Sequence, residues 1–467
     1  MNKKIRNTIF TLLPLVIIWL TPTPDGLKPQ AWHLFAIFMS TVVGFILQPI
    51  ANGAIALISL MIAVLSGVLN LKQALSVFSN STVWLIVSAF LFARGFILTG
   101  LGQRIAFVIT RSFGDSTLKL AYSLTLSDVI IGPATPSNTA RAGGVLFPIV
   151  SSLCASFNSQ PGPTAKRLGN FLMLAMFHVD IVVSAMFLTA MAANPLAMEL
   201  ARKTVGVDVT WGTWFLAAVV PGVVGLIVVP LVVYKMCPPE LKKTPEAKEF
   251  ARQELIKMGP MTIQEKIMLG VFIMALVLWA TSSFTHLEAT TVALLGICIL
   301  LATEVLKWKQ VIEESKAWDS LVWVGAVVGL AGFLNSAGFI AWFAKGVAHG
   351  LAGTNWVVAL VVAALTYLYS HYAFASMTAH VTAMYAALVA VAVAAGAPVM
   401  VTVLAIAFMA NVCGCLTHFG TGPAPIYFGA GYVDQKEWWK MGFVMSIVHV
   451  VVWLGIGGIW WKVLGFW

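Results

Sequence analysis

Residues 133–141 read PATPSNTAR and lie in the middle of an apolar segment, 118–155, that is about 40 residues long. A straight helix needs only about 20 residues to cross the roughly 30 Å hydrocarbon core of a bilayer. Within that core, a polar interruption is tolerated only where protein or a wet cavity faces it. The segment therefore predicts a re-entrant hairpin, which enters the membrane partway, turns at the polar residues and returns.

A second segment of the same kind lies in the other half of the chain. Residues 356–397 form an apolar run that the polar patch Ser376–Thr378 interrupts near its middle. The serines at the two tips, Ser137 and Ser376, are 239 residues apart, close to half of the 467-residue chain. An odd number of predicted crossings separates the hairpins, so they enter from opposite faces. This arrangement is typical of the inverted-topology repeats of secondary transporters, which work by alternating access.

The composition supports a membrane-embedded chain. Hydrophobic residues make up 60% of the sequence and charged residues only 10%, whereas soluble domains carry about 25% charged residues. A soluble enzyme is therefore excluded. Because the apolar runs are too long for barrel strands, the expected fold class is an all-α polytopic membrane protein with an inverted repeat, about 11 transmembrane helices and two re-entrant hairpins.

The basic residues indicate the orientation of the chain in the lipid bilayer. The formal net charge is +10, but the basic side chains lie in short loops rather than on one continuous face, so no nucleic-acid partner is expected. Most of the 28 Lys and Arg residues fall in loops on the side of the N-terminus. Since such loops stay in the cytoplasm, we expect an integral protein of a bacterial inner membrane with a cytoplasmic N-terminus.

The apolar pattern divides the chain into an N-terminal span, two repeats and a linker. The linker mixes both signs of charge and begins near Pro238 and Pro239. Each repeat contains one hairpin followed by one broken helix. The expected boundaries are 1–30 for the N-terminal span, 31–235 for the first repeat with hairpin 118–155 and broken helix 168–200, 236–266 for the cytoplasmic linker, and 267–467 for the second repeat with hairpin 356–397 and broken helix 398–430.

Each broken helix carries a polar interruption that would face a hairpin tip. A helix that starts after a break points unpaired amide groups and the positive end of its dipole into the gap. Hydroxyl and amide side chains beside such helix ends would orient a bound carboxylate. The residues expected to enclose this site are Ser137, Asn138, Thr139, Ser376, Met377, Thr378, Thr417, Thr421, Gly422 and Pro423, with Thr189 and Asn194 in supporting positions.

Two basic residues occupy equivalent positions in the repeats. Arg141 follows Ser137 by four residues, and His380 follows Ser376 by four. A cation in the first turn of a membrane helix is disfavoured by the helix dipole and by burial unless an anion lies beside it. We expect both side chains to compensate charge, either beside a bound anion or in place of a coupling cation.

Other polar residues at membrane depth receive structural interpretations. Arg94 is expected to form a structural ion pair with a carboxylate such as Asp128 or Asp180. Cys413 and Cys415 are separated by one glycine and have no His or acidic cluster at metal-ligand spacing in the sequence. They are expected to be packing thiols. Neither a cofactor nor a bound transition metal is expected.

Three stretches carry a family resemblance that covers nearly the whole chain: Pro136–Gly144 (PSNTARAGG), Ser376–His380 (SMTAH) and Gly414–Tyr432 (GCLTHFGTGPAPIYFGAGY). The sequence resembles the divalent anion:sodium symporter family, in the branch of bacterial citrate/succinate and tartrate/succinate exchangers and plastid 2-oxoglutarate/malate translocators. The resemblance implies a homodimer in which a transport domain moves like an elevator against a scaffold domain. It also implies that the substrate carboxylates are held by Ser137, Asn138, Thr139, Ser376, Thr378 and Thr421.

One residue departs from the family pattern. Sodium-coupled members have Ser, Asn and Thr at both tips, whereas Met377 replaces the second Asn here. A thioether is a poor ligand for a hard cation. Fixed cations, unlike sodium, cannot leave with the substrate, so an empty carrier should return slowly. The hypothesis is obligate, sodium-independent exchange of one di- or tricarboxylate for another.

Two alternatives stay open. A sodium- or proton-coupled dicarboxylate symporter would hold sodium near Ser137, Asn138 and Ala190. A polytopic membrane enzyme is disfavoured, because no GxSxG or HExxH motif is present and a hydrolase would not need two inverted copies of its site. Succinate, malate, fumarate, 2-oxoglutarate, tartrate and citrate all fit as substrates, because hydroxyls and backbone amides bind any carboxylate similarly.

Overall fold

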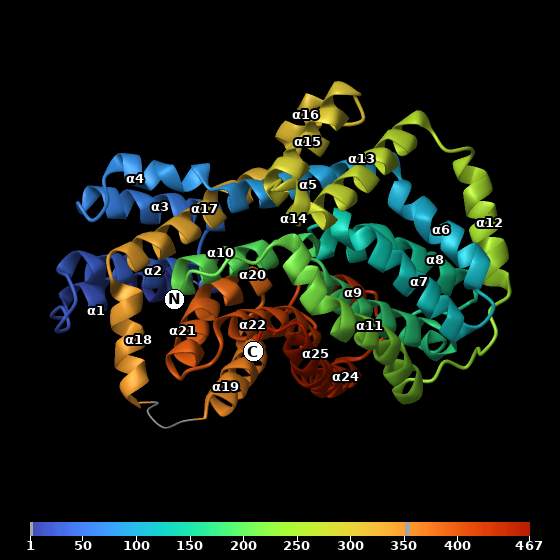
Figure 1. The fold of residues 1–467 in the computed structure, drawn as a ribbon. Helices are drawn as coiled ribbons and strands as arrows, with labels where there is room; N and C mark the ends of the chain where they lie inside the picture. The colour runs from blue at the N-terminus through green and yellow to red at the C-terminus, as the bar shows by residue number, and fades with distance from the viewer. Residues whose placement is uncertain (1–2, 351–354) are drawn as a thin grey trace.

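The computed structural model describes residues 3–350 and 355–467, which fold into helices joined by short loops (Figure 1). Within these ranges, nine helices are apolar and long enough to cross a bilayer, and three shorter apolar helices accompany them. The prediction of an all-α polytopic membrane protein is confirmed. The first two residues of the expected N-terminal span, and residues 351–354 of the expected second repeat, lie outside the described residues.

One group of helices occupies the upper and left parts of Figure 1, and we call its members the frame helices. They are α1 (Lys3–Leu20), α2 (Pro29–Leu47), α3 (Asn52–Leu65), α4 (Leu71–Ser76), α5 (Ser81–Thr99), α13 (Ile263–Ala280), α14 (Ser282–Thr285), α15 (Ala289–Ala302), α16 (Trp308–Glu313), α17 (Ser315–Ser336) and α18 (Phe339–Gly350). Helix α17 packs against α2, α3 and α5, and α15 packs against α5 and α13. The group thus joins the first part of the chain to the start of its second half.

Both apolar segments of about 40 residues fold as helix pairs around a polar tip. The first consists of α7 (Thr117–Ile131), the 3-10 turn η2 (Gly132–Ala134), the π-helical stretch η3 (Thr139–Leu146) and α8 (Phe147–Ser156). The second consists of α19 (Trp356–Ser370), the 3-10 turn η6 (His371–Ala373), α20 (Met377–His380), the π-helical stretch η7 (Val381–Tyr385) and α21 (Ala386–Ala394). We call residues 135–139 tip 1 and residues 374–378 tip 2.

A broken helix follows each hairpin. The first runs through α9 (Gly169–Met186), the turn η5 (Leu188–Ala190) and α10 (Ala193–Val205). The second runs through α22 (Val399–Val412), the turn η8 (Cys413–Cys415) and α23 (Ala424–Gly429). We call residues 187–192 break 1 and residues 413–423 break 2. The Nδ2 atom of Asn411 donates to Oδ1 of Asn194 at 2.8 Å, which ties the two broken helices together at their breaks.

The hairpins and broken helices form the second group, together with three further helices. These are α11 (Trp211–Met236), α24 (Gln435–His449) and α25 (Gly457–Val463). Helix α9 is buried along its whole length, because α7, α11 and α22 pack around it. Helix α10 packs against α21 and α22 on one side and against the frame helix α17 on the other. The tips and breaks therefore lie where the two groups meet.

The linker is folded rather than extended. It contains α12 (Glu246–Met258), which packs against α6 (Leu101–Phe113) at the right of Figure 1. Arg104 of α6 donates through Nε to the Glu265 carboxylate at 2.5 Å and through Nη1 to the carbonyl of Gly259 at 2.9 Å. Nη2 of Arg104 donates to the other oxygen of the same carboxylate at 3.1 Å, and a bidentate pair of this kind fixes orientation as well as position. The segment that separates the two halves is thereby anchored to the first half.

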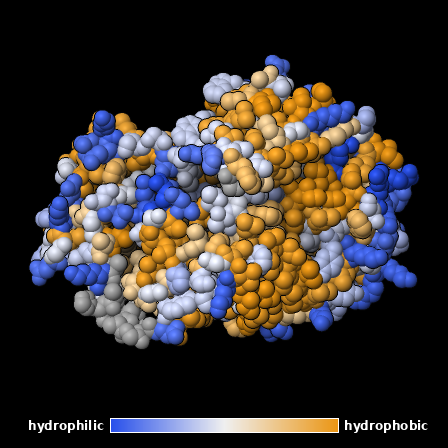
Figure 2. Space-filling view, viewed as in Figure 1, coloured by the Kyte–Doolittle hydropathy of each residue, from blue (hydrophilic) through white to orange (hydrophobic). Residues whose placement is uncertain are grey.

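The outer surface is apolar where lipid would contact it. Figure 2 shows a broad hydrophobic face around the position of α11, with hydrophilic residues gathered toward the edges of the molecule. Val223 and Ile227 on α11, and Ile273 and Val277 on α13, are exposed. Exposed apolar patches of this extent are rare on soluble monomers. The surface agrees with a protein integral to the bilayer.

Candidate functional site

A cavity of about 280 Å³ lies where both tips meet break 1, break 2 and the frame helices α5 and α17. Ser137 and Ser376 line the same space although they are 239 residues apart. Uncharged side chains make up its wall. The lining residues are Phe90, Pro136, Ser137, Asn138, Thr139, Met191, Ala192, Ser320, Trp323, Ala375, Ser376, Met377, Thr378, Thr421 and Gly422.

The two tips have the same capping geometry. The Oγ atom of Ser137 accepts from the backbone N–H of Ala140 at 3.2 Å, and Oγ of Ser376 accepts from that of Ala379 at 3.3 Å. Each serine therefore caps the helical arm that follows its tip. Since the first turn of a helix has N–H groups without intrahelical partners, both arms direct partial positive charge at the cavity.

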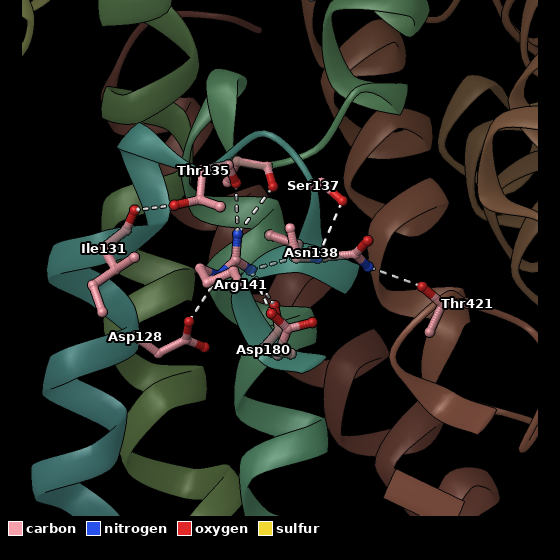
Figure 3. Close-up of polar contacts among 12 residues, drawn as sticks. Asp128, Ile131, Thr135, Ser137, Asn138, Arg141, Asp180 and Thr421 are labelled. Atoms are coloured by element: carbon pink, nitrogen blue, oxygen red, sulfur yellow. Dashed lines mark hydrogen bonds and ion pairs between the residues drawn. The ribbon is translucent and has the colours of Figure 1, made fainter. Parts of the chain in front are cut away.

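Tip 1 is held against break 2, which belongs to the other half of the chain. Nδ2 of Asn138 donates to Oγ1 of Thr421 at 2.9 Å (Figure 3). Beside this bond, Thr139 lies so close to Gly422 that a Cβ atom at position 422 would overlap the Thr139 hydroxyl. Glycine is therefore required at 422 for this contact. The hydrogen bond and the close approach together close one side of the cavity.

Arg141 lies behind tip 1 and is fully buried (Figure 3). Nε donates to Asp128 at 2.7 Å, and Nη2 donates to Asp180 at 2.6 Å and to the hydroxyl of Ser184 at 2.8 Å. Nη1 donates to the carbonyls of Thr135 at 3.2 Å and Ala190 at 3.0 Å. Since a guanidinium has five N–H donors, these bonds use all of them. Of the two roles expected for Arg141, direct contact with a bound anion does not fit this geometry.

Arg141 also holds two backbone carbonyls near tip 1. The carbonyls of Thr135 and Ala190 are oxygen ligands of the type that hard cations use, and Nη1 of Arg141 already occupies both. A sodium ion was expected near Ala190 if the protein were a symporter. Nη1 of Arg141 donates to the carbonyl of that residue.

His380 occupies the corresponding place behind tip 2. Its Nδ1 atom lies 3.0 Å from Nδ1 of His371, and its Nε2 atom lies 2.9 Å from the hydroxyl of Ser370. The His371 Nε2–H donates to the carbonyl of Gly420 in break 2 at 2.8 Å. In each half, a basic side chain behind the tip thus donates to a carbonyl of the break in the same half: Ala190 in break 1 and Gly420 in break 2. The side chain in the second half is His371, which precedes the tip, rather than His380.

Arg94 forms an ion pair, but the partners named for it are wrong. Its Nε atom has Glu314 as the nearest carboxylate, at 4.0 Å, whereas Asp128 and Asp180 pair with Arg141. In the sequence, Arg94 and Arg141 both fall within apolar segments. Only the packing of α7 against α9 brings Asp128 and Asp180 around Arg141.

The two supporting residues connect the breaks to neighbouring elements. The hydroxyl of Thr189 donates to the carbonyl of Pro133 at 2.8 Å and accepts from Trp211, so it links break 1 to the first hairpin. Nδ2 of Asn194 donates to the carbonyls of Ser184 and Phe187 at 2.8 and 3.0 Å, on the far side of the same break. Neither residue lines the cavity.

Two residues of the expected site lie outside the cavity wall, and several wall residues were not expected. Thr417 and Pro423 belong to break 2 but do not line the cavity. Phe90, Ser320 and Trp323 form the wall opposite the tips. They lie within the apolar spans of the frame, and no polar interruption in the sequence marks them.

A larger cavity of about 640 Å³ lies away from the tips, beside α10, α11 and α13. Glu199, Asp208 and Glu288 line it, and Arg202, which also lines it, donates to Glu199 at 2.5 Å. A paired arginine among three acidic residues is a poor environment for an anion. The smaller cavity between the tips is therefore the candidate site.

Paired hairpins and broken helices around an uncharged cavity that combines hydroxyl and amide groups with apolar side chains define a secondary membrane transporter rather than an enzyme. The sequence matches the family model "Sodium:sulfate symporter transmembrane region" over residues 2–467. The chain belongs to this family, which confirms the resemblance to the divalent anion:sodium symporters.

Individual relatives agree with this assignment. The chain is 50% identical over 465 residues to a Bacillus subtilis protein named "Putative malate transporter YflS", an alignment that covers 99% of this chain and 97% of the relative. It is 46% identical to the chloroplast dicarboxylate transporter 1 of Spinacia oleracea, over 99% of this chain and 82% of the relative. A crystal structure of the Alcanivorax borkumensis YdaH transporter has a similar fold, with a TM-score of 0.55 and 12% identity, over 99% of this chain and 98% of that one.

Proposed function

We propose that this chain is a secondary transporter that exchanges one dicarboxylate or tricarboxylate for another across the membrane. The observation that carries this proposal is the cavity shared by tip 1 and tip 2. Two capped helix starts face one space, and each is suited to a carboxylate. A molecule with a carboxylate at either end could bind both. The names of the relatives, a malate transporter and a dicarboxylate transporter, support the same substrate class.

The size and polarity of the cavity favour a small acid. Its volume of about 280 Å³ is slightly below the range of about 300–1,000 Å³ that is common for drug-sized ligands. Hydroxyl and amide groups from Asn138, Thr378 and Thr421 are available beside the helix starts. Acids with four to six carbons, from succinate to citrate, fit this description.

Sodium independence is supported by the side chains that hold carbonyls of tip 1 and of the two breaks. Arg141 occupies the Thr135 and Ala190 carbonyls, and His371 occupies that of Gly420. Met377 adds a thioether where sodium-coupled relatives of this family would have an amide oxygen, and a hard cation prefers oxygen. We infer that no travelling cation is needed for the loaded carrier to move.

The exchange mechanism has a different physical basis from the one that the sequence indicated. Asp128 and Asp180 both pair with Arg141 within its own cluster, so the guanidinium would not cross the membrane unpaired. The helix starts and hydroxyls at the tips face Phe90 and Trp323 across the cavity. Without a bound carboxylate, these polar groups would have to move past an apolar wall without hydrogen-bond partners. Such a movement costs free energy. An empty carrier should therefore return slowly.

The movement that we propose is an elevator motion of the hairpins and broken helices against the frame helices. Its support is that the cavity lies between the two groups, with both tips on one side and α5 and α17 on the other. We also propose a homodimer with contacts through the frame helices, which is what the family resemblance implies. The distribution of basic loops favours a bacterial inner membrane with the N-terminus in the cytoplasm.

The experiment that tests the substrate class is counterflow with purified protein in liposomes. Vesicles loaded with unlabelled succinate are diluted into labelled succinate, and six external acids compete: succinate, malate, fumarate, 2-oxoglutarate, tartrate and citrate. We expect at least one to compete strongly, whereas acetate and sulfate do not. Competition by sulfate alone would contradict the carboxylate assignment. Because the family model is named for sodium:sulfate symporters, sulfate is the essential control.

A further inference from the structure

Three side chains with metal-ligating atoms meet behind tip 2. His371 of η6, His380 of α20 and Cys413 of η8 each place one such atom within 4.8 Å of the others, and all three residues are buried. Sequence spacing does not reveal this cluster, because 33 residues separate His380 from Cys413. We propose that it is a binding site for a thiophilic transition-metal cation of the zinc type, separate from carboxylate transport.

The distances are close to those around a tetrahedral ion. The two Nδ1 atoms are 3.0 Å apart, and Sγ of Cys413 lies 4.0 Å from Nδ1 of His380. Bonds of about 2.0–2.1 Å from zinc to nitrogen and about 2.3 Å to sulfur would separate two nitrogens by about 3.3 Å, and nitrogen from sulfur by about 3.5 Å. Shifts of about 0.3–0.5 Å would bring these two pairs to such distances. The ligand atoms of all three residues lie within 4.8 Å of one another. When the ion binds, both Nδ1 atoms would be unprotonated, each ring would carry its remaining proton on Nε2, and the thiol proton of Cys413 would leave.

The outer ring nitrogens already have the partners that metal-binding histidines use. His371 Nε2 lies 2.8 Å from the carbonyl of Gly420, and His380 Nε2 lies 2.9 Å from the hydroxyl of Ser370. Such second partners fix the tautomer and the ring orientation of a ligating histidine. The His380 ring also stacks on Tyr367, with centroids 4.0 Å apart. The two Nδ1 atoms are thus held facing each other before any ion binds.

A fourth donor atom, the thioether sulfur of Met377, connects the cluster to the transport cavity. Met377 lines the cavity, and its Sδ atom lies 4.0 Å from Sγ of Cys413. A Cβ atom at Gly414 would come within 3.3 Å of this Sδ, so the glycine leaves room for the methionine. Two imidazoles, a thiolate and a thioether form a donor set that soft and borderline ions prefer over magnesium or calcium. We expect an ion to enter from the cavity past Met377.

Cobalt binding tests the proposal, because Co²⁺ bound by a thiolate in tetrahedral geometry absorbs in the near-ultraviolet and visible ranges. Full-length protein without a histidine tag is titrated with Co²⁺ in detergent, in the absence of carboxylates. We expect one Co²⁺ per chain with thiolate-to-cobalt absorption, which Zn²⁺ displaces. Cys413→Ser should abolish that absorption and weaken Co²⁺ binding at least tenfold. Cys413→Ala provides a second variant in case the serine variant does not fold.

Cys415→Ser is the matched control. Cys415 lies in the same turn and is equally buried, but its Sγ atom faces the carbonyl of Gly442 at 3.5 Å rather than the histidines. This variant should bind Co²⁺ as the unchanged protein does. Absence of thiolate-to-cobalt absorption in the unchanged protein would overturn the proposal without reference to any variant. Equal loss of binding in the Cys415 and Cys413 variants would also overturn it.

Discussion

Arg141 is the residue on which the region behind tip 1 depends most. Arg141→Ala would leave Asp128 and Asp180 buried without their shared cation, and removing one partner of a buried ion pair costs about 3–5 kcal/mol. Asp128→Asn is the comparison, because Arg141 would keep Asp180 and Ser184. We expect Arg141→Ala to lower the thermal unfolding midpoint in detergent far more than Asp128→Asn. Equal midpoints would contradict the cluster as described.

The hydrogen bond between Asn138 and Thr421 joins the two halves directly at the cavity. Thr421→Val keeps the shape of the side chain but removes the acceptor at 2.9 Å. A hydrogen bond of this kind contributes about 0.5–1.5 kcal/mol net, so we expect the KM for exchange to rise about 2- to 10-fold. The control is Thr402→Val, whose buried hydroxyl bonds only to its own helix at Pro398. A similar rise in both variants would argue against a local role for Thr421.

Among the structural elements, the close approach of tip 1 to break 2 allows a sharper test. In Gly422→Ala, the new Cβ would overlap the Thr139 hydroxyl, so tip 1 or break 2 must move and the cavity must change shape. We expect the exchange rate to fall at least tenfold. Gly429→Ala in α23 should have little effect, because a Cβ atom at position 429 would meet nothing within 4 Å. The exchange rates of both variants are measured by counterflow at matched protein amounts. A Gly422→Ala variant that exchanges at the unchanged rate would contradict the close contact between Thr139 and Gly422.

The hairpins were predictable from the sequence because a polar interruption divides an apolar run of twice the necessary length. The same pattern indicated which residues of tip 1 and tip 2 face one cavity. The wall opposite the tips was not predictable, because Phe90 and Trp323 look like ordinary apolar span residues. The environment of Arg141 was also hidden, since Asp128 and Asp180 lie 13 and 39 residues from it in the chain. Only helix packing brings them together.

Considering the molecule in full, the cavity lies between two groups of helices that would have to separate during an elevator motion. Ser320 of the frame and Ala375 of tip 2 both line it. In a Ser320→Cys/Ala375→Cys variant with Cys298 replaced by serine, a flexible bifunctional thiol reagent should join the groups and arrest exchange. If the cross-linking reagent can be cleaved by reduction, reduction should separate the two groups again and restore exchange. Each single-cysteine variant is the control, and continued exchange with the two groups joined would contradict movement between them.

The proposed transport cycle requires that bound carboxylate, rather than sodium, allows the carrier to cross the membrane. This requirement is tested by measuring uptake of labelled succinate into two sets of proteoliposomes. One set contains unlabelled succinate without a sodium gradient, and the other contains no carboxylate but has an inward sodium gradient. We predict rapid uptake into the first set and little into the second. Rapid sodium-driven uptake into the empty vesicles would contradict exchange and establish symport.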